Sequence, residues 1–312
     1  MRIAAALFLS TACSVIEDEE PVRPVNPQVF LSQQTARIRA NLHFCDNRVV
    51  SGKPNNISGR PRCDTGDTWV FSGLYNTIAH DPEISASLDA AVLPSGQPCR
   101  GTEYLVLGDK CDFSRDQTKG FLLNLLETKN KEVATKTWQF VYNNDYSICD
   151  LDVSENCFQT PGMLILWGDV FEKIGLPREP DMQYGFPYTE QVDRQELLAE
   201  ARVNNGYRLH LVSVSIYIKA LTGQLTSAYS EAARILAERK PDNLWFQFLS
   251  NYTNGGDQDT YDRIARKLVP IMERWNPGND LDWIWQRDGI AQKEPEAYGH
   301  ELVFLAELLQ GE

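Results

Sequence analysis

The 312-residue sequence lacks the motifs that mark several large enzyme classes. It has no phosphate-binding glycine-rich loop, no Gly-x-Ser-x-Gly elbow, no His-Glu-x-x-His pair and no dinucleotide fingerprint. These absences argue against P-loop enzymes, elbow-type serine hydrolases, zinc proteases and dinucleotide-dependent enzymes. Beyond the first twelve residues, no apolar run approaches the roughly 20 residues that a membrane-spanning helix needs.

Basic residues are in deficit, with 30 Lys and Arg against 43 Asp and Glu, which gives a formal net charge of −13. A field of this sign repels nucleic acids and anionic bilayers, so we expect neither as a general partner. The four histidines and seven cysteines have no short metal-ligand spacing such as Cys-x2-Cys. We therefore expect no metal site and no cofactor.

Helix starts recur at a fixed interval along the chain. Asp67, Ser114, Pro161 and Arg208 each open an apolar segment, and successive members are 47 residues apart. A period of this size indicates a repeated supersecondary unit whose copies bury their apolar faces on one another. The unit here is typical of a helical hairpin.

Two kinds of predicted helix alternate along the chain, distinguished by how much of the helix circumference is apolar. Helices with a single apolar stripe, which we expect on the outside, cover 28–41, 83–92, 131–142, 190–203, 225–239 and 258–274. Helices that are apolar most of the way round, which we expect inside, cover 67–80, 114–127, 161–175, 208–222, 242–251 and 299–310. The alternation predicts an all-α fold, a closed (α/α)6 toroid over residues 28–312.

The N-terminus has the pattern of an export signal. Residues 1–12 hold one Arg, a short apolar core and a run of small residues that ends at Cys13. That cysteine resembles the lipidation site of a bacterial lipoprotein, although Ser10 stands where such boxes usually place Leu. An apolar start that arose by chance is the alternative. Residues 13–27 are acidic and proline-rich and would serve as a tether.

The other six cysteines form three close pairs in turn-rich segments. Proximity favours the disulfides Cys45–Cys63, Cys99–Cys111 and Cys149–Cys157, although six cysteines allow 15 connectivities. Disulfides agree with export to an oxidising compartment. Each bridged loop leads into a predicted inner helix. If the inner helices point the same way, these loops surround one mouth of the ring, where rigid loops often carry sites.

Carboxylates at this mouth are the first candidates for catalysis. Asp67 and Asp116 occupy equivalent positions at two inner-helix starts, where either could activate water; helix capping, with a capping box Ser114-x-x-Gln117, is the alternative. A helix N-terminus keeps an Asp ionised, so the proton donor must be another group. Glu103, in the loop before Ser114, and Glu301, at the start of the last inner helix, are candidate donors.

Cationic and aromatic residues suggest how a substrate would be held. Arg115 could bind a carboxylate, and Tyr207 and Arg208 open the inner helix at 208–222. In a lyase, Tyr207 or His210 would abstract a proton next to a uronate; a core histidine is the alternative for His210. Trp283 and Trp285 lie in a long irregular connection; aromatics there stack on sugars or cover a core. The 45–63 loop carries four cations and one acid, which suits an anionic ligand.

In layout, residues 28–310 resemble the (α/α)6-toroid carbohydrate-active enzymes, which include inverting glycoside hydrolases and polysaccharide lyases. Short phrases, Gly66-Asp67-Thr68, Phe113-Ser114-Arg115-Asp116 and Lys240-Pro241-Asp242-Asn243, also resemble bacterial envelope lipoproteins. Neither resemblance transfers catalytic residues, because no catalytic motif can be matched position by position.

These observations lead to two functional hypotheses. The first is an exported hydrolase or lyase that acts on a polysaccharide or oligosaccharide in a cleft at the N-terminal ends of the inner helices. The second is a non-catalytic envelope lipoprotein that binds a glycan or protein, and it predicts a flat or plugged mouth. Both describe a monomer that lies in the periplasm, on the outer membrane or outside the cell, with a lipid at Cys13 as its one membrane attachment.

Overall fold

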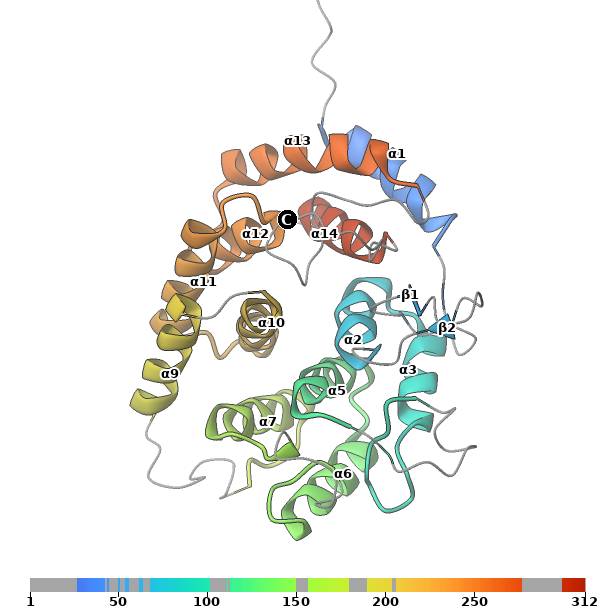
Figure 1. The fold of residues 1–312 in the computed structure, drawn as a ribbon, viewed down its shortest axis with the longest axis vertical. Helices are drawn as coiled ribbons and strands as arrows, with labels where there is room; N and C mark the ends of the chain where they lie inside the picture. The colour runs from blue at the N-terminus through green and yellow to red at the C-terminus, as the bar shows by residue number, and fades with distance from the viewer. Residues whose placement is uncertain are drawn as a thin grey trace, which may run out of the picture.

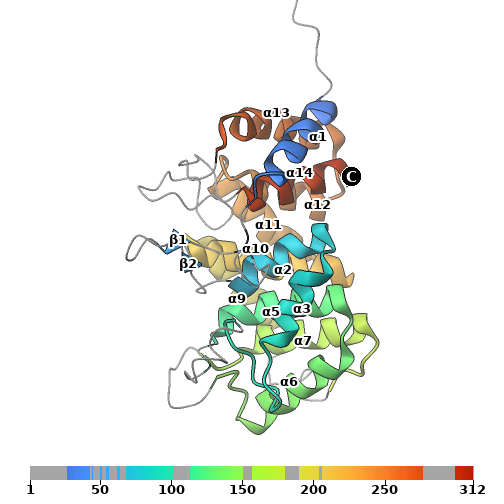
Figure 2. The same ribbon diagram turned by 90° about the vertical axis from the view of Figure 1, so that its right-hand side faces the viewer.

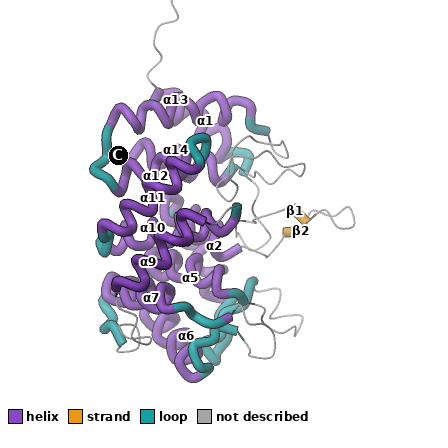
Figure 3. Tube along the Cα trace, turned by 60° about the vertical axis from the view of Figure 1, so that its left-hand side comes forward, coloured by secondary structure: helices purple, strands orange, loops and turns teal. Residues whose placement is uncertain are grey.

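The computed structural model describes residues 27–42, 44, 50, 54–55, 62–63, 68–101, 111, 113–149, 157–179, 190–203, 206–276 and 299–311. Helices dominate these ranges, as Figure 3 shows. Those predicted inside are α2 (Thr68–Ala79), α5 (Arg115–Thr128), α7 (Pro161–Ile174), α10 (Tyr207–Thr222), α12 (Leu244–Thr253) and α14 (His300–Gly311). Those predicted outside are α1 (Pro27–Arg39), α3 (Pro82–Ala90), α6 (Lys131–Asn143), α9 (Glu190–Val203), α11 (Ser227–Arg239) and α13 (Gln258–Arg274).

The all-α prediction is confirmed, and each helix begins and ends within two residues of its predicted limits. Two strands of two residues each, β1 (Pro54–Asn55) and β2 (Arg62–Cys63), pair antiparallel inside the segment predicted to be a bridged loop. The signal segment 1–12, Cys13 and the tether up to residue 26 lie outside the described residues.

Polar side chains fix several helix starts. Asp81, Asn130, Asn243 and Asp257 each accept a hydrogen bond from a backbone N–H two or three residues later, which satisfies a donor that the helix itself cannot. The capping box predicted at Ser114 is wrong. Ser114 is the N-cap of α5, but its side chain makes no capping hydrogen bond, and the side chain three residues later is buried instead.

The helices form two layers, with the apolar set inside (Figure 1). Inner helices that follow one another along the chain are in contact from α2 through α5, α7 and α10 to α12, and α14 contacts α2. Among the outer helices, α1 packs on both α13 and α14, so the first and last described helices are neighbours (Figures 1 and 2). No described helix is long and apolar enough to cross a membrane.

Aromatic side chains fill the space between the inner helices. The rings of Tyr217, Trp245 and Phe304, from α10, α12 and α14, lie 5.2–5.8 Å apart between centroids. The Tyr217 hydroxyl also lies 3.2 Å from Oγ1 of Thr77 on α2, which joins α10 to a helix across the interior. The interior is therefore a packed core at this level.

Helices α2 and α5 make the most extensive contact between any two elements of the described chain, and glycine makes it possible. A Cβ atom built on Gly120 would lie 2.1 Å from the backbone carbonyl oxygen of Trp69, and one on Gly73 would lie 2.7 Å from the Gly120 carbonyl oxygen. The two backbones touch at a distance that no other residue permits. This contact holds the start of α5 in place.

Two of the predicted disulfides, Cys99–Cys111 and Cys149–Cys157, are present. The Cys99 carbonyl accepts a hydrogen bond from the Trp69 indole of α2, and Cys111 lies shortly before α5. The third predicted pair, Cys45–Cys63, includes Cys45, which lies outside the described residues. Disulfides form and persist in oxidising surroundings, so the chain is an extracellular or periplasmic protein.

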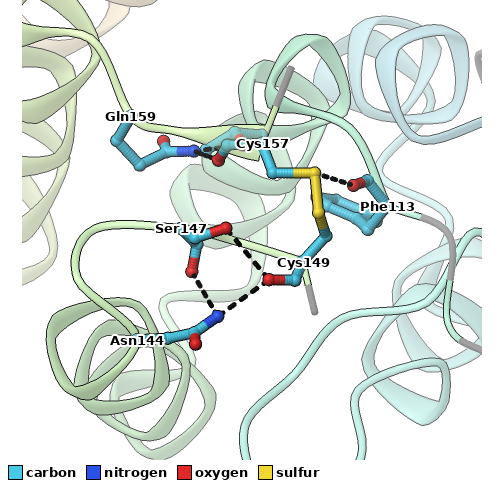
Figure 4. The surroundings of a disulfide bond; sticks show 7 residues. Phe113, Asn144, Ser147, Cys149, Cys157 and Gln159 are labelled. Carbon is cyan, nitrogen blue, oxygen red and sulfur yellow. Dashed lines mark hydrogen bonds between the residues drawn. A yellow bond between two sulfur atoms is a disulfide. The ribbon is translucent and has the colours of Figure 1, made fainter. Parts of the chain in front are cut away.

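The Cys149–Cys157 bridge lies beside the start of α5 (Figure 4). The Cys157 sulfur lies 3.8 Å from the carbonyl oxygen of Phe113, and Asn144 donates a 2.7 Å hydrogen bond to the Cys149 carbonyl. Gln159 then connects the bridge to two inner helices, since it donates to the Thr118 hydroxyl of α5 and accepts from the Trp167 indole of α7. Both disulfides therefore brace the beginning of α5.

The α2–α5 contact predicts the effect of adding one methyl group. We expect Gly120→Ala to lower the free energy of unfolding by about 1–3 kcal/mol, because the new Cβ would meet backbone atoms that cannot move aside cheaply. Gly311→Ala on α14 is the matched control, since its Cβ meets no atom within 4 Å. Urea unfolding of the two variants measures the difference; equal stability would show that the contact is loose.

Candidate functional site

A cavity of about 940 Å³ opens where the first turns of α5, α7 and α10 meet α9. The predicted mouth residues Arg115, Asp116, Tyr207 and Arg208 all line it. Other lining residues come from the same helices, from α11 and from the loop before α5: Arg100, Ser114, Lys119, Thr160, Gly162, Met163, Leu166, Glu196, Leu197, Ala199, Glu200, Val203, Leu211, Ser215 and Tyr229. Three inner-helix N-termini thus converge on one hollow.

Both signs of charge line this cavity, with cations on the inner helices and in the loop before α5. Arg115, Lys119 and Arg208 belong to α5 and α10, and Arg100 lies in the preceding loop. Glu196 and Glu200 of α9 and Asp116 of α5 supply the negative charges. Because the N-terminal ends of three helices also carry partial positive charge, the inner-helix side favours an anionic group.

Lys119 lies one turn after Arg115 on α5. Its Nζ donates a 2.7 Å hydrogen bond to the carbonyl oxygen of Leu211 on α10. The pKa of Lys119 is lowered to about 8, chiefly by burial; the Asp116 and Glu200 carboxylates oppose this shift, and the nearby Arg115 guanidinium adds to it. This amine therefore titrates close to neutral pH.

Buried ion pairs support the wall of the cavity on the α10 side. Asp169 of α7, which is 2% exposed, pairs with Lys219 of α10 and with Arg178 beyond the end of α7. The Lys219 ammonium lies 5.1 Å above the centre of the Tyr229 ring, and that ring lines the cavity. A buried carboxylate with two cationic partners links α7 to α10 and fixes the position of the tyrosine.

Two candidate residues lie away from the cavity. His210 is fully buried between the rings of Phe71 and Tyr207, with centroids 5.8 and 5.9 Å away, which agrees with the alternative of a core histidine. Glu301 is 3% exposed, and the neighbouring His300 ring packs against Phe44 and Tyr75. Neither is among the described residues that line the cavity.

The remaining candidates, Asp67, Glu103, Trp283 and Trp285, lie outside the described residues. Four charged residues that line the cavity were not predicted as site residues: Arg100, Lys119, Glu196 and Glu200. For Lys119 the sequence did contain a signal, because it is a lysine within a helix predicted to be buried nearly all round. The glutamates of α9 resemble any exposed outer-helix acid, and the fold alone reveals them.

A second hollow, of about 600 Å³, lies between α6 and the end of α7. Trp138, Tyr142 and Phe171 line it together with Pro177. Within the described residues, no three His, Cys, Asp or Glu side chains lie close enough to hold a metal ion.

Comparison with known protein families gives no match, and neither does comparison with curated proteins. The site must therefore be interpreted from its own residues.

The buried carboxyl of Glu301 predicts a pH-dependent stability. Burial raises its pKa to about 8, against the opposing effect of the backbone N–H groups of Gly299 and Glu301. The folded state thus favours the protonated carboxyl, and its contribution to stability is lost as the pH rises from about 4.5 through about 8. Glu301→Gln keeps the shape and cannot ionise.

We expect Glu301→Gln to gain stability relative to the natural protein as the pH rises from about 5 to about 9, by about 2–4 kcal/mol in total. Urea unfolding at several pH values measures this difference. Glu231→Gln on α11 makes the same chemical change at a glutamate whose carboxylate reaches solvent, and it serves as the control. A difference between Glu301→Gln and the natural protein that stays constant with pH would show that the carboxyl titrates normally.

Proposed function

We propose that the chain is a closed (α/α)6 toroid and an exported carbohydrate-active enzyme whose active site is the 940 Å³ cavity. The sequence of inner-helix contacts supports the closed ring, because α14 contacts α2 and the Trp245 ring of α12 lies 5.2 Å from Phe304 of α14. In such a ring the inner helices share one direction. The convergence of three of their N-termini agrees with that arrangement.

The observation that carries the proposal is the cationic wall of the cavity. Arg115, Lys119 and Arg208 line a hollow large enough for a sugar unit, and α9 supplies Glu196 and Glu200 to the same hollow. A guanidinium binds a planar carboxylate through paired hydrogen bonds, and carboxylates accept hydrogen bonds from sugar hydroxyls. A uronate-containing polysaccharide presents both groups together and is the substrate class we propose.

A β-elimination suits these residues best. Arg115 and Arg208 would hold the uronate carboxylate and stabilise the negative charge that develops when the adjacent carbon loses its proton. Tyr207 lies at the same N-terminus as Arg208 and is a candidate for proton transfer. His210, the other base considered for this reaction, is buried away from the cavity and has no part in the proposal.

Hydrolysis is the alternative reaction. Asp116 lines the cavity and would activate water, with a proton donor about 6.5–9.5 Å away in an inverting mechanism. Of the two donors predicted, Glu301 does not line the cavity and Glu103 lies outside the described residues. The alternative of a non-catalytic scaffold expects a flat or plugged mouth, and the open cavity argues for an enzyme instead.

The same proposal includes the route to the envelope. Residues 1–12 would direct export, and a lipid on Cys13 with the tether that follows would hold a monomeric catalytic domain at the membrane surface. The disulfides are compatible with either an anchored or a released form.

Activity on a panel of uronate-containing and neutral polysaccharides tests the reaction class. We expect an unsaturated product that absorbs in the ultraviolet from a uronate-containing polysaccharide. Arg115→Ala should lower kcat/KM by about 10- to 100-fold, because a hydrogen bond to a charged group is worth about 1.5–3 kcal/mol.

Arg234→Ala is the matched control, since this arginine lies on α11 and pairs only with exposed glutamates of its own helix. It should leave kcat/KM unchanged. New reducing ends without ultraviolet absorbance would establish hydrolysis in place of elimination. No product from any polysaccharide would favour the non-catalytic alternative.

A further inference from the structure

Lys119 is unusual among lysines because its ammonium end bonds to the backbone of a neighbouring inner helix inside the cavity. Lysine side chains generally extend their charged end to solvent. Here the amine reaches from α5 across to α10 and donates to the Leu211 carbonyl, 2.7 Å away. The Ser215 hydroxyl donates to the same carbonyl at 3.2 Å, so the oxygen that holds the lysine is itself fixed within α10.

The charges around Lys119 decide which form of the amine the cavity holds. Asp116 and Glu200 favour the ammonium form, whereas Arg115 and burial favour the neutral amine. The opposing effects leave both forms accessible near neutral pH, with a pKa of about 8. A neutral amine that donates one N–H to Leu211 keeps its lone pair for a proton from a molecule in the cavity.

Arg115 occupies the same face of α5, one turn before Lys119, and both line the cavity. A carboxylate held by Arg115 would therefore lie beside the Lys119 amine. Tyr207 lines the same hollow from the first turn of α10. The arrangement places an anion-binding group, an amine and a phenol around one space.

Resting on the proposed elimination, we infer that Lys119 is its proton acceptor. The neutral amine removes the proton from the carbon next to the uronate carboxylate and becomes an ammonium. The electron pair of that C–H bond forms a carbon–carbon double bond with the neighbouring ring carbon. The glycosidic C–O bond at that neighbouring carbon breaks, and the Tyr207 hydroxyl gives its proton to the departing oxygen.

The active site returns to its starting state without any further reactant. The Lys119 ammonium loses its proton to water, and the Tyr207 phenolate regains one. No oxidant or reductant is consumed, and the products are one unsaturated chain end and one new hydroxyl.

A simpler role for Lys119 is a positive charge that attracts the substrate carboxylate. Replacing Lys119 with arginine distinguishes the two roles. Arginine supplies the same charge but does not lose its proton in proteins, so it can bind an anion and cannot act as the base. Lys119→Arg therefore separates catalysis from binding.

We expect Lys119→Arg to keep KM within about threefold and to lower kcat by about 10²- to 10⁴-fold, the range of a lost general base. In the natural protein, kcat/KM should rise with pH until the amine is neutral, near pH 8. The variant should lack this rise. Lys131→Arg is the matched control, because Lys131 also donates to a backbone carbonyl, that of Gly175 at 3.0 Å, and does not line the cavity.

Chemical rescue gives a second measurement that does not depend on arginine fitting the site. Added ethylamine should restore part of the activity of Lys119→Ala, with a rate that follows the concentration of the neutral amine. It should not affect Arg115→Ala. Thermal unfolding of each variant establishes that it is folded.

The two proposals fail in distinguishable ways. If the natural protein forms the unsaturated product and Lys119→Arg retains its kcat and its pH dependence, Lys119 is not the base and the elimination stands. If amine fails to rescue a folded Lys119→Ala, the same conclusion follows. If the natural protein forms no unsaturated product, the elimination is wrong and the role of Lys119 falls with it.

Discussion

The contact between Gly120 and the backbone of Trp69 is the constraint on which the rest of the structure depends. It brings α5 against α2 more closely than side chains would allow, and it fixes the position of the segment that carries Ser114 to Lys119. The two described disulfides and Gln159 hold the same segment from the other side. One helix start is thus immobilised by backbone contact, covalent bridges and hydrogen bonds together, as a preorganised site requires.

The Lys119 amine lines the cavity at a cost to the stability of the fold. An amine that donates to a carbonyl of another helix is costly to bury, and the neighbouring carboxylates offset only part of that cost. The Asp169 carboxylate, by contrast, pairs with the two cations Arg178 and Lys219, and the Lys219 pair joins α7 to α10. The fold thus separates a structural set of buried charges from a set that lines the hollow.

The sequence predicted most of the fold because hydrophobic periodicity reports directly on burial. The helix limits followed from that periodicity, the division into inner and outer helices from the width of each apolar face, and two disulfides from proximity in the chain. Side-chain direction was harder to predict. His210 and Glu301 lie in the predicted inner helices, but their side chains are buried in the core. Because neighbouring positions of a helix point in different directions, a shift of one residue along the helix changes whether a side chain faces the core or the cavity.

The two cavity-lining glutamates of α9 could not be predicted from the sequence for a different reason. Glu196 and Glu200 reach the cavity because the outer helix α9 packs against α10. This contact between helices is tertiary, so no local sequence pattern predicts it. Lys119 was visible as an anomaly in an apolar helix, although its partner on α10 is 92 residues away along the chain.

The packing of α1 on α13 and α14 has a consequence for how the chain matures. Nearly the whole described sequence separates these partners, so the apolar stripe of α1 has no native surface to cover until the last helices have been synthesised. The packing of α1 must therefore wait until α13 and α14 have been translated. An emerging chain in which α1 is still unpacked is the form that can be threaded through a secretion pore.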